Sequence, residues 1–158
     1  MTKIILSLIF FIVNFNSKFP NMKKLSLSIA IIISCSVSGQ NITGKWKTID
    51  DKTGKDKSHV EIYEKDGKFY GKVIHIIDPL KREKVCSECN GVKKNKKVIG
   101  MVIIESLLRD GDYYENGTIL DPDNGKTYDC KIWVDGNGDM QVRGYLGWFF
   151  RTQTWLKI

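Results

Sequence analysis

From residue 41 onward, apolar side chains recur in short runs rather than at helical spacing. Each run is rich in Val, Ile, Tyr, Phe or Trp and is bounded by Gly, Asp or Asn, a pattern typical of β-strands joined by tight turns. Asp66-Gly67 is the clearest hairpin turn, because Asp-Gly tolerates the positive φ that such turns need. We therefore predict strands over residues 44–49, 58–64, 68–77, 98–107, 112–120, 126–134, 140–146 and 151–157.

Eight strands joined mostly by tight turns favour an antiparallel meander. A meander of this length usually closes on itself, because closure removes the exposed strand edges. The predicted fold is therefore all-β, an antiparallel up-and-down β-barrel of about eight strands. Alternation supports it: Tyr128, Cys130, Ile132 and Val134 fall on one face of their strand. Residues 68–77 carry apolar side chains on both faces, so this strand is either covered on both sides or lines a cavity.

The first 39 residues have a different pattern. Met22-Lys23-Lys24 precedes an apolar run over 25–33 and a small, polar segment over 34–39, which is the order of a signal peptide. We predict a leader over 1–39, with Met22 as the expected true start, and one β-barrel domain over 40–158. Residues 32–35 also resemble a lipobox, in which Cys35 would carry acyl chains and anchor the protein to the envelope. Either reading predicts export, to the periplasm or beyond the cell.

Composition and charge narrow the function classes. With 158 residues, 42% hydrophobic and 27% charged, the chain has a one-domain length and an ordinary globular composition. The net charge of +7 does not indicate nucleic-acid binding, because residues 1–39 hold four Lys and no acidic residue. The remainder has 21 basic and 18 acidic residues, a net charge of only +3.

Three segments together resemble the exported bacterial family of domain of unknown function 2147 (DUF2147). They are Gly-Lys-Trp at 44–46, ILDPDNGKTY at 119–128, and RGYLG at 143–147 followed by RTQTW at 151–155. The resemblance implies a lipocalin-like, calycin-type barrel outside the cytoplasm, with no established enzymatic activity. It also implies a small hydrophobic or amphipathic ligand, lipid-like or aromatic, by analogy of fold.

A ligand site is expected where the last two strands meet the first. In lipocalin-like barrels the Trp of Gly-x-Trp covers one end and an Arg from the last strands stacks on it; here Trp46 with Arg151, or Arg143, would do so. Gln141, Arg143 and Tyr145 share one strand face, as do the Arg, Gln and Trp of the last strand. If both faces line the barrel mouth, they could clamp a carboxylate or phosphate; if they point outward, they form a solvated surface. The expected ligand-binding residues are Trp46, Arg143, Tyr145, Arg151, Gln153 and Trp155.

Cys86 and Cys89 are spaced as CxxC. In an exported protein the simplest interpretation is a local disulfide, with Cys130 buried and free. A variant is a disulfide between Cys130 and one cysteine of the pair. The alternatives are half of a zinc site completed by Cys130, His59 or His75, and a redox-active pair. A metal site is not expected, because none of the completing ligands lies near the pair in sequence.

No nucleophile elbow, metalloprotease motif or phosphate-binding loop occurs, so neither catalysis nor a cofactor is expected. The predicted function is an exported barrel that binds a small ligand, without nucleic acid as a partner. The alternative is a cell-envelope structural or interaction module with a filled barrel. There residues 148–150 (Trp-Phe-Phe) and the lysine run over 93–97 would contact a partner, although a plug over the barrel end is favoured for the three aromatics. The lysine run would otherwise be a solvated loop.

Overall fold

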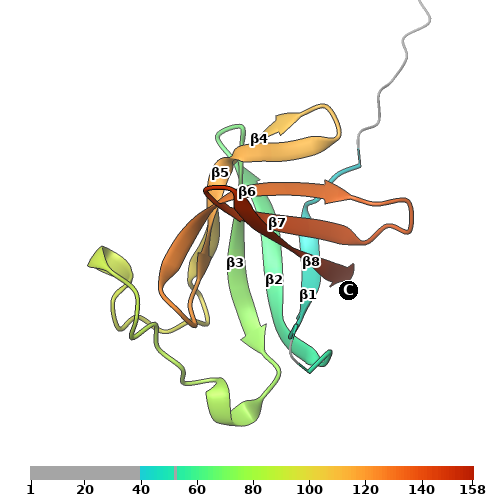
Figure 1. Ribbon diagram of the computed structural model, residues 1–158. Coiled ribbons are helices and arrows are strands. Elements are labelled where there is room, and N and C mark those ends of the chain that lie inside the picture. The colour runs from blue at the N-terminus through green and yellow to red at the C-terminus, as the bar shows by residue number, and fades with distance from the viewer. Residues whose placement is uncertain (1–39, 52) are drawn as a thin grey trace, which may run out of the picture. The chain divides into compact units, whose positions relative to one another are not determined.

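The computed structural model describes residues 40–51 and 53–158, and the whole of the predicted leader, residues 1–39, lies outside them. Strands dominate this part of the chain (Figure 1). Two short 3-10 helices, η1 (Pro79–Lys81) and η2 (Gly91–Lys93), lie in the longest connection. The strands are β1 (Gly44–Ile49), β2 (Asp56–Lys65), β3 (Lys68–Ile76), β4 (Val102–Asp110), β5 (Tyr113–Asp121), β6 (Lys126–Val134), β7 (Met140–Leu146) and β8 (Phe149–Lys157).

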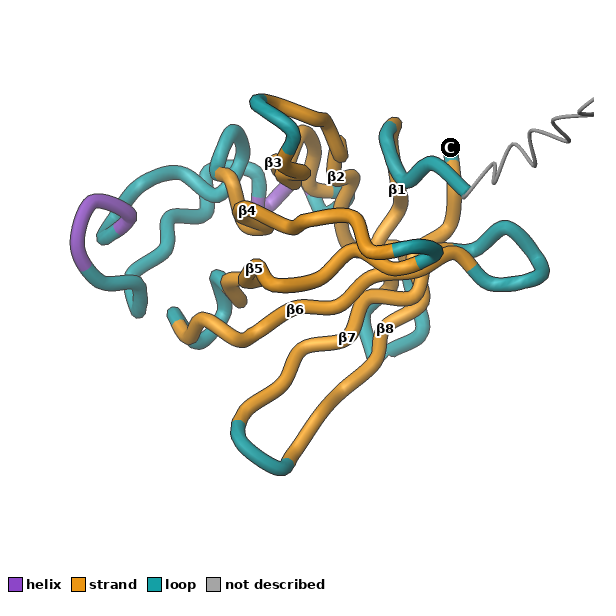
Figure 2. Tube along the Cα trace, turned by 90° about the horizontal axis from the view of Figure 1, so that it is seen from above, coloured by secondary structure: helices purple, strands orange, loops and turns teal. Residues whose placement is uncertain are grey.

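Each strand pairs antiparallel with its neighbour in sequence, and β8 pairs with β1 to close a barrel. Figure 2 shows β4 to β8 lying side by side in chain order. The closing ladder is short, with the pairs Trp46↔Lys157 and Lys47↔Leu156. The prediction of an antiparallel up-and-down barrel is confirmed.

Five of the eight strands have bounds that differ from the predicted ones, and the starts of β4 and β8 are the two differences that matter here. β4 begins at Val102 rather than at residue 98, because the Val98 N–H donates to the Lys84 carbonyl of the preceding loop at 2.9 Å. Gly100 and Met101 contact β3 only through irregular hydrogen bonds with Val73. β8 begins at Phe149, which pairs with Leu146 across a turn of Gly147 and Trp148. The predicted aromatic plug is therefore wrong, since residues 148–150 extend a hairpin and are 98%, 81% and 61% exposed.

The core fills the barrel toward the end where β1 begins. Trp46 is buried and its Nε1–H donates to the Ile42 carbonyl at 2.7 Å. The Tyr114 hydroxyl donates to the Gln40 carbonyl at 3.1 Å, so the segment before β1 is held across this end of the barrel. Ile42 is fully buried there. Burial of these large aromatic and aliphatic side chains supplies most of the driving force for folding.

Because successive strands of an up-and-down barrel run in opposite directions, successive connections lie at alternate ends of the barrel. The turns β2–β3, β4–β5 and β6–β7 lie at the end beside Trp46, which we term the closed end. The connections β1–β2, β3–β4, β5–β6 and β7–β8 lie at the other end, which we term the mouth end. The long β3–β4 connection, including η1 and η2, therefore belongs to the mouth end (Figure 1).

A disulfide joins Cys86 to Cys89, so of the three interpretations of this pair the disulfide is confirmed. Both cysteines are buried, and a bridge between Val85 and Lys97 closes the base of the loop that carries them. This loop, residues 84–98, is termed the disulfide loop. It lies against the outside of the barrel, where it shares clefts with the outward side chain of Leu120, which is nevertheless 5% exposed.

Candidate functional site

The register of β7 and β8 decides where the predicted ligand residues lie. Directly paired residues of an antiparallel ladder point to the same face of the sheet. Arg151 pairs with Gly144, on the inner face that Val142 shares, whereas Arg143 pairs with Thr152 on the outer face. The structure therefore does not bring the two predicted sets together.

The three predicted residues of β8 do lie together on the inner face, running from the core to the mouth end. Trp155 is buried, and its Nε1–H donates to Gln153 Oε1 at 3.4 Å. The Gln153 side-chain amide donates to Asp51 Oδ2 at 2.5 Å. The Arg151 guanidinium forms an ion pair with the same Asp51 oxygen, and its side chain is 63% exposed. Arginine and amide donors therefore converge on one carboxylate at the mouth.

Trp46 is 1% exposed and has a structural role as the apolar floor of the barrel. The cation over its ring is Lys157, with Nζ 5.9 Å from the ring centroid, and not the expected Arg151 or Arg143. The reason is the register: Trp46 pairs with Lys157, at the opposite end of β8 from Arg151. The prediction of an arginine stacked on Trp46 is corrected accordingly.

Arg143 and Tyr145 belong to an outer surface across β6, β7 and β8. The Arg143 guanidinium carbon lies 5.0 Å from the centroid of Trp133 and 4.5 Å from that of Phe150. Its Nε–H donates to Thr152 Oγ1 at 2.8 Å. Tyr145 packs on Phe150 with ring centroids 6.1 Å apart. These contacts hold Arg143 flat on the outside of the barrel.

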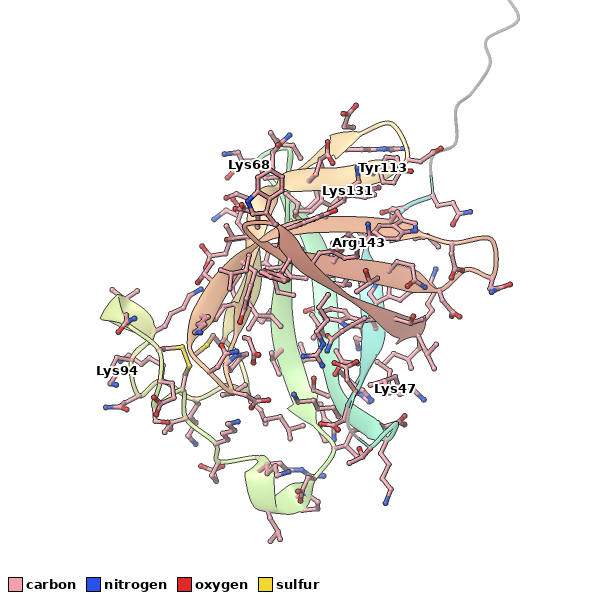
Figure 3. The ribbon with its side chains drawn as sticks, viewed as in Figure 1. Lys47, Lys68, Lys94, Tyr113, Lys131 and Arg143 are labelled. Atoms are coloured by element: carbon pink, nitrogen blue, oxygen red, sulfur yellow. A yellow bond between two sulfur atoms is a disulfide. The ribbon has the colours of Figure 1, made fainter. Side chains whose placement is uncertain are left out.

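The same surface continues onto β5. Lys131 Nζ lies 3.8 Å from the centroid of Tyr113 and forms an ion pair with Glu115 at 2.8 Å. Figure 3 shows Tyr113, Lys131 and Arg143 following one another on this side of the molecule. Cation–π contacts of this kind stabilise exposed strands modestly.

The inner face changes from apolar to polar along the barrel. Thr48, on the same face as Trp46 but nearer the mouth, shares a 2.8 Å hydrogen bond with Ser58. The Tyr128 hydroxyl accepts a hydrogen bond from the Asn124 side-chain amide at 3.0 Å. The mouth end of the interior therefore presents hydroxyl, amide and guanidinium groups above an aromatic floor.

Sequence reasoning missed Asp51 and Tyr128. Asp51 lies in what reads as an ordinary β1–β2 turn, and only the connectivity shows that this turn shares an end with Arg151. Tyr128 was recognised as sharing a face with Cys130, but the register is needed to place that face inside. The predicted order of the strands could have placed the Asp51 turn at the same end as Arg151. The register of the strands, which places Tyr128 inside, could not be predicted from the sequence.

Two adjoining open clefts lie outside the barrel, between the disulfide loop and the outer faces of β4, β5 and β6. Their volumes are about 350 and 420 Å³, and Lys93, Leu120 and Thr127 line both. Lys93 is already engaged, because its ammonium donates to the Val102 carbonyl at 3.0 Å and forms an ion pair with Glu105. These clefts are shallow surface features rather than openings into the barrel.

A charged cluster ties the disulfide loop to the β5–β6 turn. Asp123 in that turn accepts hydrogen bonds from Lys57 at 2.7 Å and from Lys84. Burial alone would raise the pKa of the Asp123 carboxyl, but the hydrogen bonds and charges of the two lysines outweigh it and lower the pKa to about 2. Asp123 therefore stays ionised throughout the physiological range.

The remaining titratable and thiol groups do not form a catalytic site in the part of the chain that the structure describes. His59 and His75 face each other on the outer face with ring centroids 5.3 Å apart, and desolvation together with the charge of His75 lowers the pKa of His59. Burial raises the pKa of the Cys130 thiol to about 12. Among residues 40–51 and 53–158, no three His, Cys, Asp or Glu side chains gather closely enough to hold a metal ion. No helix among those residues is both long and apolar enough to cross a membrane.

A closed eight-stranded up-and-down barrel with an aromatic floor and a polar mouth defines a lipocalin-like protein. Residues 44–157 match the family model described as "Uncharacterized protein conserved in bacteria (DUF2147)", and the chain belongs to that family. A solved structure, described as protein HP1028 from Helicobacter pylori and as belonging to the lipocalin family, is similar over 75% of this chain and 83% of its own. The two share 26% sequence identity, with a TM-score of 0.65. No curated protein matches the chain.

Proposed function

We propose that this protein is an exported binding protein, not an enzyme, whose barrel mouth takes a small amphipathic ligand with an anionic head group. One observation carries the proposal: Arg151 and Gln153 converge on the carboxylate of Asp51 at the mouth. The protein therefore already contains a carboxylate receptor, in which its own side chain occupies the anion position.

The chemistry of this receptor favours an anion over a neutral head group. A guanidinium donates two parallel N–H groups to a carboxylate or phosphate, and a side-chain amide adds a third donor. Arg151 is 63% exposed along its side chain, so a ligand oxygen can reach it from solvent. A ligand carboxylate or phosphate would replace Asp51 at these donors.

The apolar part of such a ligand would lie toward the floor of the barrel. Trp155 is next to Gln153 on the same face, and it is covered by other side chains in the structure described. Ligand entry would therefore require side chains near the mouth to move, which limits the ligand to a short or slender apolar chain. The lipocalin-family neighbour supports binding of a small molecule by analogy of fold.

Export is part of the same proposal and rests on the sequence pattern of residues 22–39, which lie outside the described residues. A signal peptide would release the barrel into the periplasm or the medium, whereas acylation of Cys35 would hold it at the envelope. The Cys86–Cys89 disulfide supports an oxidising compartment.

The test is calorimetric titration of the protein with an unlabelled, unbranched medium-chain fatty acid, whose slender chain matches that limit. Arg151→Gln should weaken binding about tenfold, the cost of losing one charge-assisted hydrogen-bonded pair. Arg143→Gln is the matched control, because it removes the same charge from the outer face of the neighbouring strand. Equal losses in the two variants would contradict a site at the mouth. No saturable binding of any amphiphile, with no small molecule retained in native mass spectrometry, would favour a filled barrel with a structural role.

A further inference from the structure

Large apolar side chains stand exposed at the tips of the mouth-end connections. Leu80 in η1 is 93% exposed and Val92 in η2 is 89% exposed. Trp148 and Phe149 at the β7–β8 turn are 98% and 81% exposed. Single exposed apolar residues are common. Two adjacent exposed aromatic residues, Trp148 and Phe149, at the tip of a hairpin instead indicate a surface that binds another molecule.

These residues share one end of the barrel although they are far apart in sequence. The β3–β4 and β7–β8 connections both leave the barrel at its mouth end, because the strands alternate in direction. Figure 1 shows η1 and η2 as two separate projections of the β3–β4 connection. The apolar side chains therefore form three separate points and not one contiguous patch.

Charge is distributed unequally between the two ends. The β3–β4 connection, residues 77–101, holds seven Lys or Arg and three Asp or Glu, a net charge of +4. The other connections of the mouth end together add one net negative charge. The three closed-end turns, at residues 66–67, 111–112 and 135–139, hold four Asp and no basic residue. Lys94 is exposed on the disulfide loop, where its ammonium donates to the Ser87 carbonyl (Figure 3).

We propose that the mouth end docks on the surface of an anionic phospholipid bilayer, with Trp148 and Phe149 inserted at the level of the head groups. Tryptophan favours that interface because its ring is apolar and its N–H remains hydrogen-bonded. Leu80 and Val92 provide the second and third points of insertion. Lys81, Lys84, Lys93 and Lys97 are ion-paired with carboxylates of the protein. The attraction to lipid phosphates therefore comes from the net charge of the connection and from the exposed Lys94 and Lys96, and salt screens it.

A protein partner fits these features less well than a bilayer does. The buried centre of a protein interface is depleted of lysine, whereas Val92 is followed directly by Lys93 and Lys94. A bilayer accepts separate apolar points with cations between them, because lysine stems bury their methylenes while the ammonium groups reach phosphates. The closed end, with its aspartates, would face away from the membrane.

The docking proposal stands apart from the proposed ligand site, since none of its apolar residues belongs to that site. If both hold, the Arg151 donors open toward the bilayer, and the barrel can exchange an anionic amphiphile with it. The two proposals can fail independently, because Arg151→Gln tests only the ligand site and substitution of Trp148 tests only the docking on the bilayer.

The experiment measures quenching of Trp148 fluorescence by brominated acyl chains in vesicles, using the full-length chain. Binding alone is not informative, because the apolar leader pattern could hold any such chain on a membrane. The contribution of Trp148, among the four tryptophans of the chain, is the difference between the unaltered protein and Trp148→Phe. The matched control adds Asn137→Trp to Trp148→Phe, which moves the reporter to an exposed turn at the closed end.

Trp148 should shift to shorter wavelength and be quenched in vesicles of phosphatidylglycerol and phosphatidylcholine, with the reporter at residue 137 unquenched. Lys94→Glu combined with Lys96→Glu should weaken the quenching response about tenfold. Equal quenching at both ends, or equal quenching in pure phosphatidylcholine, would overturn the proposal. So would a blue shift that needs only higher protein concentration, because that outcome identifies a protein–protein contact at the hairpin.

Discussion

Gly125 and Glu88 are in backbone contact: a Cβ at Gly125 would overlap the Glu88 carbonyl. The contact joins the β5–β6 turn to the disulfide loop, two segments that the ladder of the barrel does not connect. Gly125 also has φ +68°, a left-handed conformation that other residues rarely adopt. Both the turn and the seating of the loop therefore require glycine at this position.

Gly125→Ala should destabilise the protein more than its backbone angle alone explains. Gly54 has the same φ of +68° with nothing within 4 Å of a Cβ, so Gly54→Ala pays only the conformational cost, about 1 to 2 kcal/mol. Gly125→Ala should cost at least about 2 kcal/mol more, because the disulfide loop must move. Urea unfolding of both variants measures the difference, and equal losses would show that the loop is not seated on the turn.

Asp123 should make stability depend on pH in the acid range. Its pKa falls from 3.8 to about 2 on folding, so its contribution is fully present above pH 4 and is lost as the pH falls through 2. Asp123→Asn should lower the free energy of unfolding at pH 7 by about 1 kcal/mol, after allowing for solvent screening of a half-exposed group. The difference in free energy of unfolding between the unaltered protein and Asp123→Asn should disappear as the pH falls through 2. A difference that stays constant down to pH 2 would exclude the carboxylate as its source.

If Asp51 occupies the position of a ligand anion, removing its charge should strengthen ligand binding. Asp51→Asn leaves the Arg151 and Gln153 donors without their internal carboxylate, and the affinity for an anionic amphiphile should rise several-fold. Asp56→Asn is the control: it removes the same charge from the outer face, where Asp56 pairs with Lys47. The fatty-acid titration measures both. A similar rise in the control would indicate a general charge effect instead of competition at the mouth.

Arg143 should matter for stability and not for binding. Its guanidinium lies between Trp133 and Phe150 and donates to Thr152. Arg143→Ala should therefore lower the free energy of unfolding by about 1 to 2 kcal/mol, whereas Lys68→Ala, on an exposed strand end, should change it by less than about 0.5 kcal/mol. Thermal and urea unfolding provide the comparison. If Arg143→Ala weakened ligand binding and left the stability unchanged, the result would contradict the structural role and indicate that Arg143 binds the ligand.

Thiol counting tests the cysteine chemistry. Cys86 and Cys89 are joined, and burial with a pKa near 12 keeps the Cys130 thiol unreactive in the folded barrel. A thiol reagent should find no reactive barrel cysteine in the folded protein and one, Cys130, after denaturation without reductant. Cys35 adds a second thiol only where residues 1–39 are retained and unmodified. Three barrel thiols without reductant would contradict the disulfide.

The fold could be predicted because its signals are local. Apolar alternation and Asp-Gly turns specify each hairpin, and closure follows from the need to cover strand edges. The faces of β6 were also predictable, since Cys130 and Ile132 are both buried as the alternation indicates. The CxxC spacing alone left zinc and redox alternatives open, and the expectation of export was what favoured the disulfide that the structure contains.

The site was only half predictable, because register is not local. Arg143 and Arg151 both belong to arginine-aromatic motifs, and only the pairing of Arg151 with Gly144 places one inside and the other outside. The partner of Trp46 depends on the closing ladder, which brings Lys157 to it from the end of the chain. A shift of one residue in either ladder would have reversed these assignments.

The junction of β1 and β8, which closes the barrel, is its most weakly paired ladder. β1 and β8 meet through two residue pairs, whereas β7 and β8 pair along seven positions. Amide hydrogens along the β1–β8 junction should therefore exchange with solvent before those of any other ladder, because few bonds need to break there. Gln153 and Trp155 lie on one side of that junction and Trp46 on the other. Local separation of β1 from β8 would open a path from solvent to the aromatic interior while the hairpins of the barrel stay folded.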